Sequence, residues 1–560
     1  MKKIRKVAAL VGVLALFGCE DITDLEVINQ NDPDRARAIT SPEDVEALIA
    51  GSYYRFFNGW EKSVPGMALS TTADEGSMSW GNWASRELSS EPRLPWTNKT
   101  TASYQGFTYT PWRDSYRAAS LVYDGLLAIN DSVNPVAIGD GGVDTPRALT
   151  FAKFVQGVAH GHQALMFDKG FIIDETVNFE DSLPFFSYQE IMDTALKYLD
   201  MAIDMCTNNS FVLPPTWIQG SQFTNIELRG LARWYKGRYL HAVARNSTDR
   251  DAADWGMINT LYDQGMTDLG RDFIIYGSGS WWQRVKAHGQ EPDWMRADYK
   301  TLCSYEVGGT GCANWLQTAV ADRYEFQFQS PDARIMGATP TSDGTDYNWG
   351  GPSDFYASRG TYHFSEYFYY RYYWFWPGYL GDMPMITVDE INLRKAEAVY
   401  RLNGVNQTVV DLINSTRVGR GQMTPLTTND AAADVWYALM HEKRVEMHHL
   451  ASSMAYFDKR GYPLAQTGPN IHAGLVVGSP CHFPIPSREL ELMELPSYTF
   501  GGVGSECTQI GGSAAAFANA RIPFSKIYAF DGLETIGEKL ALLRDEDVEL
   551  DPGVRQLTRY

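Results

Sequence analysis

The chain has 560 residues, of which 44% are apolar and 21% are charged, and its formal net charge is −20. These proportions are typical of a folded globular protein and exclude a largely disordered chain. No long cluster of Lys and Arg occurs inside the chain, which argues against a nucleic-acid partner because binding phosphates requires a basic face. The length predicts several domains or one helical repeat array.

The first 18 residues have the layout of a secretory signal peptide. A basic segment, MKKIRK, precedes the apolar segment VAALVGVLALF, which is too short to span a bilayer. The segment ends in LFGC, which resembles the lipobox of bacterial lipoproteins. We therefore expect residues 1–18 to be removed, Cys19 to be lipidated and residues 19–40 to form a tether. An ordinary signal peptide with a coincidental Cys is the alternative.

Five other cysteines follow, an odd number for an exported protein. Cys303 and Cys312 flank the glycine-rich segment SYEVGGTG and are expected to form a short disulfide. Cys481 and Cys507 are candidates for a second bridge. Cys206 ends a predicted helix and is expected to be a free, buried thiol. No C-x-x-C motif occurs, so a zinc or thioredoxin-like site has no support.

Several helices are predicted in the first half of the chain. SPEDVEALIAGSYYRFF begins one, with Ser41 as its cap and Pro42 in its first turn. Helical patterns follow at about 111–130 and 148–170. SYQEIMDTALKYLDMAIDMC is the clearest, because Ser187 and Glu190 form a capping-box pattern and its apolar residues share one face. NIELRGLARWYKGRYLHAVAR predicts another.

The segment VDEINLRKAEAVYRLNG predicts a helix with two apolar faces. One face holds Val388, Ile391, Ala398 and Leu402, and the nearly opposite face holds Leu393, Ala396 and Tyr400. Such a helix must lie between neighbours, as in the stacked helix pairs of a solenoid. Gly404 is expected to end it, and NQTVVDLINSTRVGRG is expected to be the return helix. One further helix is predicted over DVWYALMHEKRVEMHHLASSMAYFDKRG.

Four segments, in order, resemble the SusD/RagB family of outer-membrane nutrient-binding lipoproteins. The opening VINQNDPDRARAITSPEDVEALIAGSYY fits, and the helix pair after DMPMIT is similar to the family's central pair. The next helix matches the family's Glu-x-Arg-x-Glu at Glu442, Arg444 and Glu446. HFPIPSRELELM matches its late Pro-Ile-Pro-x-x-Glu-Leu segment. LASSMAY in place of Glu-Gly-x-Arg, and Met493-Glu494 in place of Asn-Pro, mark a divergent member.

The resemblance implies a mostly all-α fold: a tetratricopeptide-like helix-pair scaffold carrying irregular ligand-binding loops and a few short strands. One domain is expected over residues 41–560. The helical scaffold is expected to include about residues 41–58, 111–250 and 385–465. The ligand-binding loop regions are expected at about residues 60–110 and 270–380.

The resemblance also implies a function. It implies a lipid-anchored outer-membrane protein, facing the cell exterior, that delivers an oligosaccharide to a TonB-dependent, SusC-like barrel transporter. A peptide ligand is the alternative within the family, and a secreted glycoside hydrolase or a purely structural scaffold is the alternative outside it. Neither enzymatic activity nor a cofactor is expected.

Aromatic side chains in the two loop regions are candidate ligand contacts, because flat rings stack on the apolar faces of sugars. The candidates are Trp80, Trp83, Trp96, Trp281, Trp282, Tyr347 and Trp349, with Asp74, Glu75 and Arg284 as candidates for hydroxyl contacts. Of the adjacent Trp281 and Trp282, one is expected to be an exposed stacking surface and the other its anchor.

The run YHFSEYFYYRYYWFWPGY, residues 362–379, raises a separate question, because twelve of its eighteen residues are aromatic. Its charged residues and Pro377 exclude a membrane span. Its aromatics would alternate between the faces of a strand, so a buried or buttressing strand is expected. A glycan platform made by the run is the alternative.

Signals for chemistry are weak. His160 and His162 would point to different helix faces, and His441-Glu442 lacks the second His of an H-E-x-x-H motif. His448 and His449 are expected on a polar helix face. The terminal DEDVELD is expected to be a solvated acidic face, with a calcium site as the alternative.

We expect Cys19→Ala to release the protein from the membrane fraction or to leave it unprocessed, because no thiol remains at the lipobox to be acylated. Cell fractionation and acyl labelling measure this directly. Membrane-bound, acyl-labelled Cys19→Ala protein would contradict the assignment.

Overall fold

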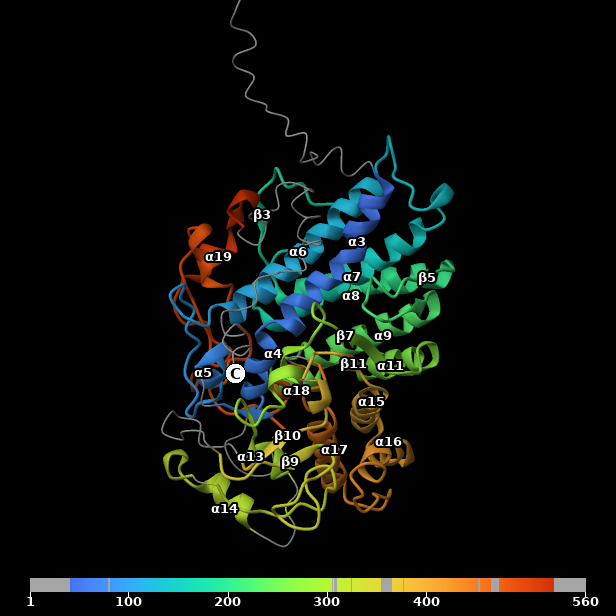
Figure 1. Ribbon diagram of the computed structural model, residues 1–560. Helices are drawn as coiled ribbons and strands as arrows, with labels where there is room; N and C mark the ends of the chain where they lie inside the picture. Colours follow the sequence, from blue (N-terminus) through green and yellow to red (C-terminus); the bar gives the residue numbers. More distant parts are fainter. Residues whose placement is uncertain are drawn as a thin grey trace, which may run out of the picture.

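The computed structural model describes residues 41–78, 81–304, 306, 310–323, 325–353, 365–375, 377–451, 454–464 and 473–527. The protein is mostly α-helical, as predicted (Figure 1). Its longer helices are α3 (Pro42–Phe57), α6 (Gly106–Ile129), α7 (Thr145–Met166), α8 (Tyr188–Asn208), α9 (Asn225–Ala242), α11 (Trp255–Asp268), α15 (Val388–Asn403), α16 (Gln407–Arg417) and α17 (Ala432–Glu446).

Shorter elements fill the connections. The short helical segments are η1 (Asn58–Lys62), α4 (Pro65–Thr72), η2 (Asn82–Ala84), α5 (Ser85–Ser89), η3 (Asp140–Gly142), α10 (Ser247–Asp251), α12 (Arg284–His288), α13 (Tyr299–Leu302), α14 (Gly311–Gln317), η4 (Val320–Asp322), η6 (Tyr373–Phe375), α18 (Met454–Lys459), α19 (Ser487–Leu492), α20 (Ala514–Ala518) and η8 (Phe524–Lys526).

The strands form two-stranded antiparallel sheets. Their pairs are β1 (Gly76–Ser77) with β8 (Arg296–Ala297), β2 (Lys169–Gly170) with β4 (Phe186–Ser187), β3 (Leu183–Pro184) with β12 (Arg521–Ile522), β5 (Val212–Leu213) with β6 (Phe223–Thr224), β7 (Phe273–Gly277) with β11 (Gly381–Ile386), and β9 (Tyr347–Trp349) with β10 (Tyr367–Tyr369).

The long helices pack on one another in a stack. Helix α3 packs on α6 and α7, and the contacts continue through α8, α9, α11 and α15 to α16 and α17. In Figure 1 this stack runs from α3 and α6 at the top to α16 and α17 at the bottom. Most of the irregular segments and short helices lie beside this stack, on its left in Figure 1. The β7–β11 sheet connects the irregular segments to the helical stack, because β11 leads directly into α15.

Two predicted helices are confirmed in detail. In α8 the Ser187 side chain accepts a hydrogen bond from the Glu190 backbone, and the Glu190 side chain accepts one from the Ser187 backbone. Helix α15 buries both of its apolar faces. Ile391 and Ala398 belong to the main hydrophobic core, whereas Leu393 and Ala396 belong to a second cluster with α16 and α17. Leu402 departs from the prediction, because it is 48% exposed at the helix end.

The helix predicted over 434–461 is broken. Helix α17 ends at Glu446, a turn follows in which His449 has a φ of 50°, and α18 begins only at Met454. The turn carries His448 and His449 into the interior, so their predicted place on a polar face is wrong. Burial, together with the nearby Lys459, lowers the pKa of His448 to about 3. The predicted loop regions also contain short helices, among them α4 and α12.

The aromatic run divides into a buried and an exposed part. Strand β10 is buried and pairs with β9, and Tyr372 and Phe375 are buried as well. Tyr370 and Trp374 are exposed. The buttressing strand expected here is thus present as β10, and the residues after it turn toward solvent. Residues 362–364 and 376 lie outside the part of the chain that the structure describes.

The cysteines beyond the signal peptide take the expected places. Cys303 is bonded to Cys312, with their Cα atoms 5.6 Å apart, and Cys481 to Cys507, with a Cα separation of 5.3 Å. Cys206 is a free, buried thiol. Cys19 and the DEDVELD segment fall outside the described residues. Of the helices that are described, none combines the length and the apolar character needed to cross a bilayer.

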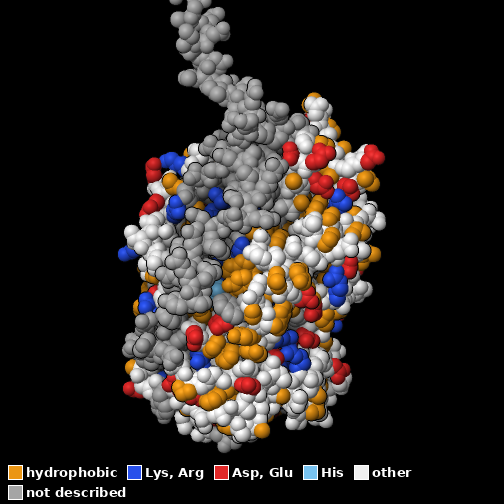
Figure 2. Space-filling view, in the orientation of Figure 1, with side chains coloured by type: hydrophobic (Ala, Val, Ile, Leu, Met, Phe, Trp, Pro, Cys, Tyr) orange, Lys and Arg blue, Asp and Glu red, His pale blue; other side chains and the backbone are white. Residues whose placement is uncertain are grey.

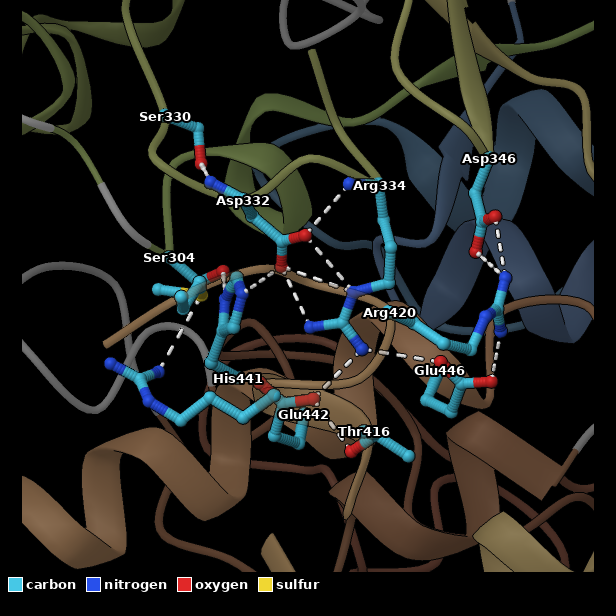
Figure 3. A network of polar contacts seen from close by, with 12 residues as sticks. Ser304, Ser330, Asp332, Arg334, Asp346, Thr416, Arg420, His441, Glu442 and Glu446 are labelled. Carbon is cyan, nitrogen blue, oxygen red and sulfur yellow. Dashed lines mark hydrogen bonds and ion pairs between the residues drawn. The ribbon is translucent and has the colours of Figure 1, made fainter. Parts of the chain in front are cut away.

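A network of buried charges holds α17 against the loop region (Figure 3). The Arg334 guanidinium lies 2.7 Å from Asp332, 2.8 Å from Glu442 and 3.2 Å from Glu446. Glu446 also pairs with Arg420, which donates two hydrogen bonds to Asp346. Burial alone would raise the pKa of Asp332, but hydrogen bonds from His441 and Arg334 outweigh it and hold that pKa well below its ordinary value.

The neighbouring residue on α17 belongs to a second network. Lys443 donates hydrogen bonds to Glu397 on α15 at 2.6 Å and to Asp458 on α18 at 3.0 Å. Arg250 and His241 reach the same carboxylates from α10 and α9. Glu442 and Lys443, adjacent residues of α17, therefore link the loop region to the helical stack.

We expect Arg334→Met to lower the free energy of unfolding by about 3–5 kcal/mol, because it leaves the buried carboxylates of Asp332 and Glu442 without their arginine, while Glu446 keeps Arg420. Chemical denaturation measures the change. Arg271→Met is the matched control, since the Arg271–Glu227 pair is largely exposed and its loss should cost at most about 1 kcal/mol. Equal effects of the two substitutions would contradict this account of the network.

Candidate functional site

Most of the side chains predicted to contact a ligand lie in the protein interior. Asp74 is fully buried and forms ion pairs with Arg93 at 3.0 Å and with Lys300 at 3.3 Å. Tyr347 is also fully buried, and its hydroxyl lies 2.8 Å from Nδ1 of His448. Trp96 packs against Phe107, and Glu75 and Arg284 are buried. None of these side chains presents a surface to a large ligand.

The prediction that Trp281 or Trp282 is exposed is wrong. Trp281 is 8% exposed and Trp282 is 3% exposed. The ring of Trp281 packs on Tyr54 and Phe57 of α3 at centroid distances of 4.9 and 4.8 Å. Trp282 stacks on Tyr379. Their partners are distant in sequence, so local turn signals could not show that both rings would be covered.

Two of the predicted tryptophans are half-buried, and they lie in different places. The Trp349 indole donates a hydrogen bond to Glu366 beside β9 and β10. Trp83 belongs to η2, where its φ of 56° is the left-handed backbone conformation that residues other than Gly rarely adopt. Trp80 lies outside the described residues.

Trp83 is part of a column of stacked rings with one cation inside it, which we call the cation–aromatic column. Trp294 stacks on Trp83 with centroids 5.0 Å apart and planes inclined by 18°. The Arg284 guanidinium lies 5.0 Å from the ring of Trp83 and 5.1 Å from that of Trp282. Trp282 then stacks on Tyr379 at 4.9 Å. Cation–π attraction and ring stacking fix these groups relative to one another.

The column continues into the segment after β10, residues 370–375 and 377–380, which we call the aromatic turn; it holds the exposed residues of the aromatic run together with the buried Tyr372 and Phe375. Tyr370 and Tyr373 stack with centroids 4.6 Å apart. Trp374 is 51% exposed and Leu380 is 58% exposed. Tyr379 belongs to both the turn and the column. Figure 2 shows hydrophobic side chains gathered near the centre of the face drawn, where Figure 1 places β7 and β11.

Two paired glycines allow the aromatic turn to pack directly on the β7–β11 sheet. Gly277 pairs with Gly381 at the end of the sheet. A Cβ on Gly277 would lie 2.3 Å from the Phe375 ring, and one on Gly381 would lie 2.5 Å from the Trp374 ring. The buried Phe375 thus anchors the turn, while Trp374 rests on bare backbone and keeps half of its surface in solvent.

Few charged groups border these rings. Glu291 contacts Tyr373 through a hydrogen bond, and burial and the nearby Asp293 raise the pKa of its carboxyl. Arg284 lies inside the column, and Lys62 lies beside Trp282, with its ammonium 6.0 Å from the ring centroid. The arrangement can stack on a flat ligand, and it offers polar groups at its rim.

Among the described residues, two buried clusters have the side-chain types of metal sites: His241 with Glu397 and Asp458, and Asp332 with His441 and Glu442. Each already contains a protein cation, Lys443 in the first and Arg334 in the second. A metal ion would have to displace that cation, so we assign both clusters to the charge networks.

A separate hollow of about 330 Å³ lies between residues 98–101 and α19. The described residues that line it are Asn98, Lys99, Thr100, Thr101, Ser487, Leu490, Glu491, Leu495 and Ser497. None of these is aromatic, so they do not provide a stacking surface like that of the aromatic turn.

Comparison with known proteins shows a likeness in fold only. No family model matches the sequence, and no curated protein does. A SusD superfamily protein from Parabacteroides distasonis is similar in structure, with a TM-score of 0.52, 13% identity and coverage of 80% of this chain and 97% of that chain. A SusD-like carbohydrate-binding protein from Bacteroides fragilis has a TM-score of 0.51, 13% identity and coverage of 75% and 86%. The chain has the SusD-like fold.

We expect Gly381→Ala to displace Trp374 and to lower the free energy of unfolding by about 1–3 kcal/mol, because Gly381 has a φ of 114° and its Cβ would overlap the indole. Tryptophan fluorescence and thermal denaturation measure the two effects. Gly378→Ala in the same turn is the control, since the nearest atom to its Cβ is 3.8 Å away. A Gly381→Ala protein with unchanged stability would contradict the close packing of Trp374 on Gly381.

Proposed function

We propose that this protein is a nutrient-binding lipoprotein and that its aromatic turn and cation–aromatic column bind an oligosaccharide. The observation that carries the proposal is the half-exposed Trp374, held beside the stacked Tyr370 and Tyr373 at the end of a fixed column. Sugar rings present apolar C–H faces that stack on such rings, and polar groups at the rim can meet their hydroxyls.

Binding, rather than catalysis, is the activity that this surface supports. Its rings are fixed by packing on the sheet and the column, so little conformational freedom is lost when a ligand stacks on them. The SusD-like fold supports the same conclusion, since one protein that shares it is described as carbohydrate-binding.

Capture at the cell surface and delivery to a TonB-dependent barrel transporter complete the proposal. The LFGC segment supports a lipid anchor at Cys19, and the acidic EDITD directly after it resembles the surface-export signals of lipoproteins. Co-purification of a SusC-like barrel with the lipidated protein tests the partnership. A screen of glycans and peptides against protein that begins after Cys19 tests the ligand class, and binding of peptides alone would overturn the oligosaccharide proposal.

We expect Trp374→Ala to weaken binding of an oligosaccharide found in that screen by about tenfold, because the stacking contact and its buried area are both lost. The melting temperature should change little, since half of the indole is exposed. Titration calorimetry and a thermal melt measure the two quantities.

Tyr276→Ala is the matched control for Trp374→Ala. Tyr276 is 47% exposed on β7, one residue from Gly277, so it points to the other face of the sheet. If Trp374→Ala binds like the unmodified protein, or if both variants lose affinity equally, the aromatic turn is not the binding surface.

A further inference from the structure

A second cation, Lys62, lies beside the cation–aromatic column, near the Arg284 guanidinium inside it. Lys62 is the last residue of η1, and its carbonyl accepts a hydrogen bond from Nε of Arg284 at 3.1 Å. The Lys62 side chain is half-buried, and its ammonium reaches the Trp282 ring, over which Arg284 also lies. The site therefore holds two neighbouring positive charges in a chain of strongly negative net charge.

Lys62 faces other cations and no carboxylate. Among the residues that the structure describes, no Asp or Glu forms an ion pair with the Lys62 ammonium. Arg55 from α3 and Arg284 from α12 both repel it. The adjacent Glu61 is turned away, since it accepts a hydrogen bond from Gln283 at 2.5 Å. Burial, followed by these two arginines, lowers the pKa of Lys62 to about 8.

A half-buried ammonium without an anion is a binding site for one, because a charge-assisted hydrogen bond from outside would offset both its desolvation and the repulsion of the arginines. The ring of Tyr379, which stacks on Trp282 and belongs to the aromatic turn, indicates where the rest of such a ligand would lie. The anion must therefore be attached to a group that stacks.

We propose that the ligand is an acidic oligosaccharide, with a carboxylate or sulfate on one sugar unit that pairs with Lys62 while the sugar rings stack on the aromatic turn. This inference rests on the proposed function, because it names the class of oligosaccharide that the same surface takes. Lys62 is the residue that sets the preference for acidic ligands, and the aromatic rings supply the affinity that acidic and neutral sugars share.

The test is a calorimetric panel of matched acidic and neutral oligosaccharides. It contains oligogalacturonate and its methyl ester, oligoalginate and its carboxyl-reduced form, chondroitin sulfate oligomers and their desulfated form, and neutral xylo-, manno- and gluco-oligosaccharides. We expect at least one acidic member to bind about tenfold or more tightly than its neutral partner. Comparing the carboxylate pairs with the sulfate pair identifies which anion the site binds.

Variants at Lys62 assign that preference. Lys62→Gln should lower the affinity for the acidic member about tenfold and so remove the difference between the acidic member and its neutral partner, whereas Lys62→Arg should keep the preference. Lys197→Gln is the matched control, because Lys197 is exposed on α8 and its loss changes the net charge equally. A thermal melt checks folding, which Lys62→Gln should not weaken because it removes a half-buried charge.

A pH series gives a second measurement. The ligand anion stays charged between pH 7 and 9, while Lys62 loses its proton as the pH rises through about 8. Binding of the acidic member should therefore weaken over this range in the unmodified protein and stay constant in Lys62→Arg, because Arg55, Arg284 and an introduced Arg remain charged.

The outcomes separate the two proposals. Binding of neutral members as tightly as acidic ones, with a loss in Trp374→Ala, would overturn the acidic class and leave the oligosaccharide function standing. An acidic preference that survives in Lys62→Gln would overturn the role of Lys62. Binding of no member of the panel would overturn the proposed function itself.

Discussion

The charged side chains in the last turns of α17, from Glu442 to Glu446, are buried, and the arrangement of the surrounding segments depends on pairing them. A buried charge without a partner costs several kcal/mol, so each of these groups requires a specific counter-ion brought from elsewhere in the chain. Glu442 and Glu446 take Arg334 from the loop region, and Lys443 takes Glu397 and Asp458 from the helical stack. One helix thereby fixes the loops relative to the stack, and the loops carry the candidate site.

The site itself is ordered by rings and glycines rather than by charges. The column from Trp294 to Tyr379 joins η2, α12 and the segment before β11 through stacked rings and the Arg284 guanidinium. The opposed Gly277 and Gly381 let the aromatic turn lie directly on the sheet. Because packing on this backbone fixes the turn, a ligand that stacked on the exposed face of Trp374, as proposed, would cost little conformational entropy.

The sequence was sufficient for the scaffold because its signals are local. The capping box of Ser187 and Glu190 and the two apolar faces of α15 depend on residues within a few turns of one another, and the structure confirms both. The site could not be derived in this way. Trp281 and Trp282 are covered by Phe57 and Tyr379, which lie far away in the chain. Trp294 was not among the predicted residues, although the turn former Pro292-Asp293 beside it was a usable signal, and Trp374 lies in the run for which a glycan platform was only the alternative.

The attachment of the aromatic turn has a consequence for how ligand preference can change during evolution. The turn is fixed by Phe375 and by the backbone of two glycines, whereas Tyr370 and Trp374 are exposed and Tyr373 is half-buried. Substitutions at such surface positions usually alter stability by no more than about 0.5 kcal/mol. The three rings can therefore be exchanged without compensating mutations in the helices. New specificities are accessible by single steps, while the interior that holds the turn stays constant.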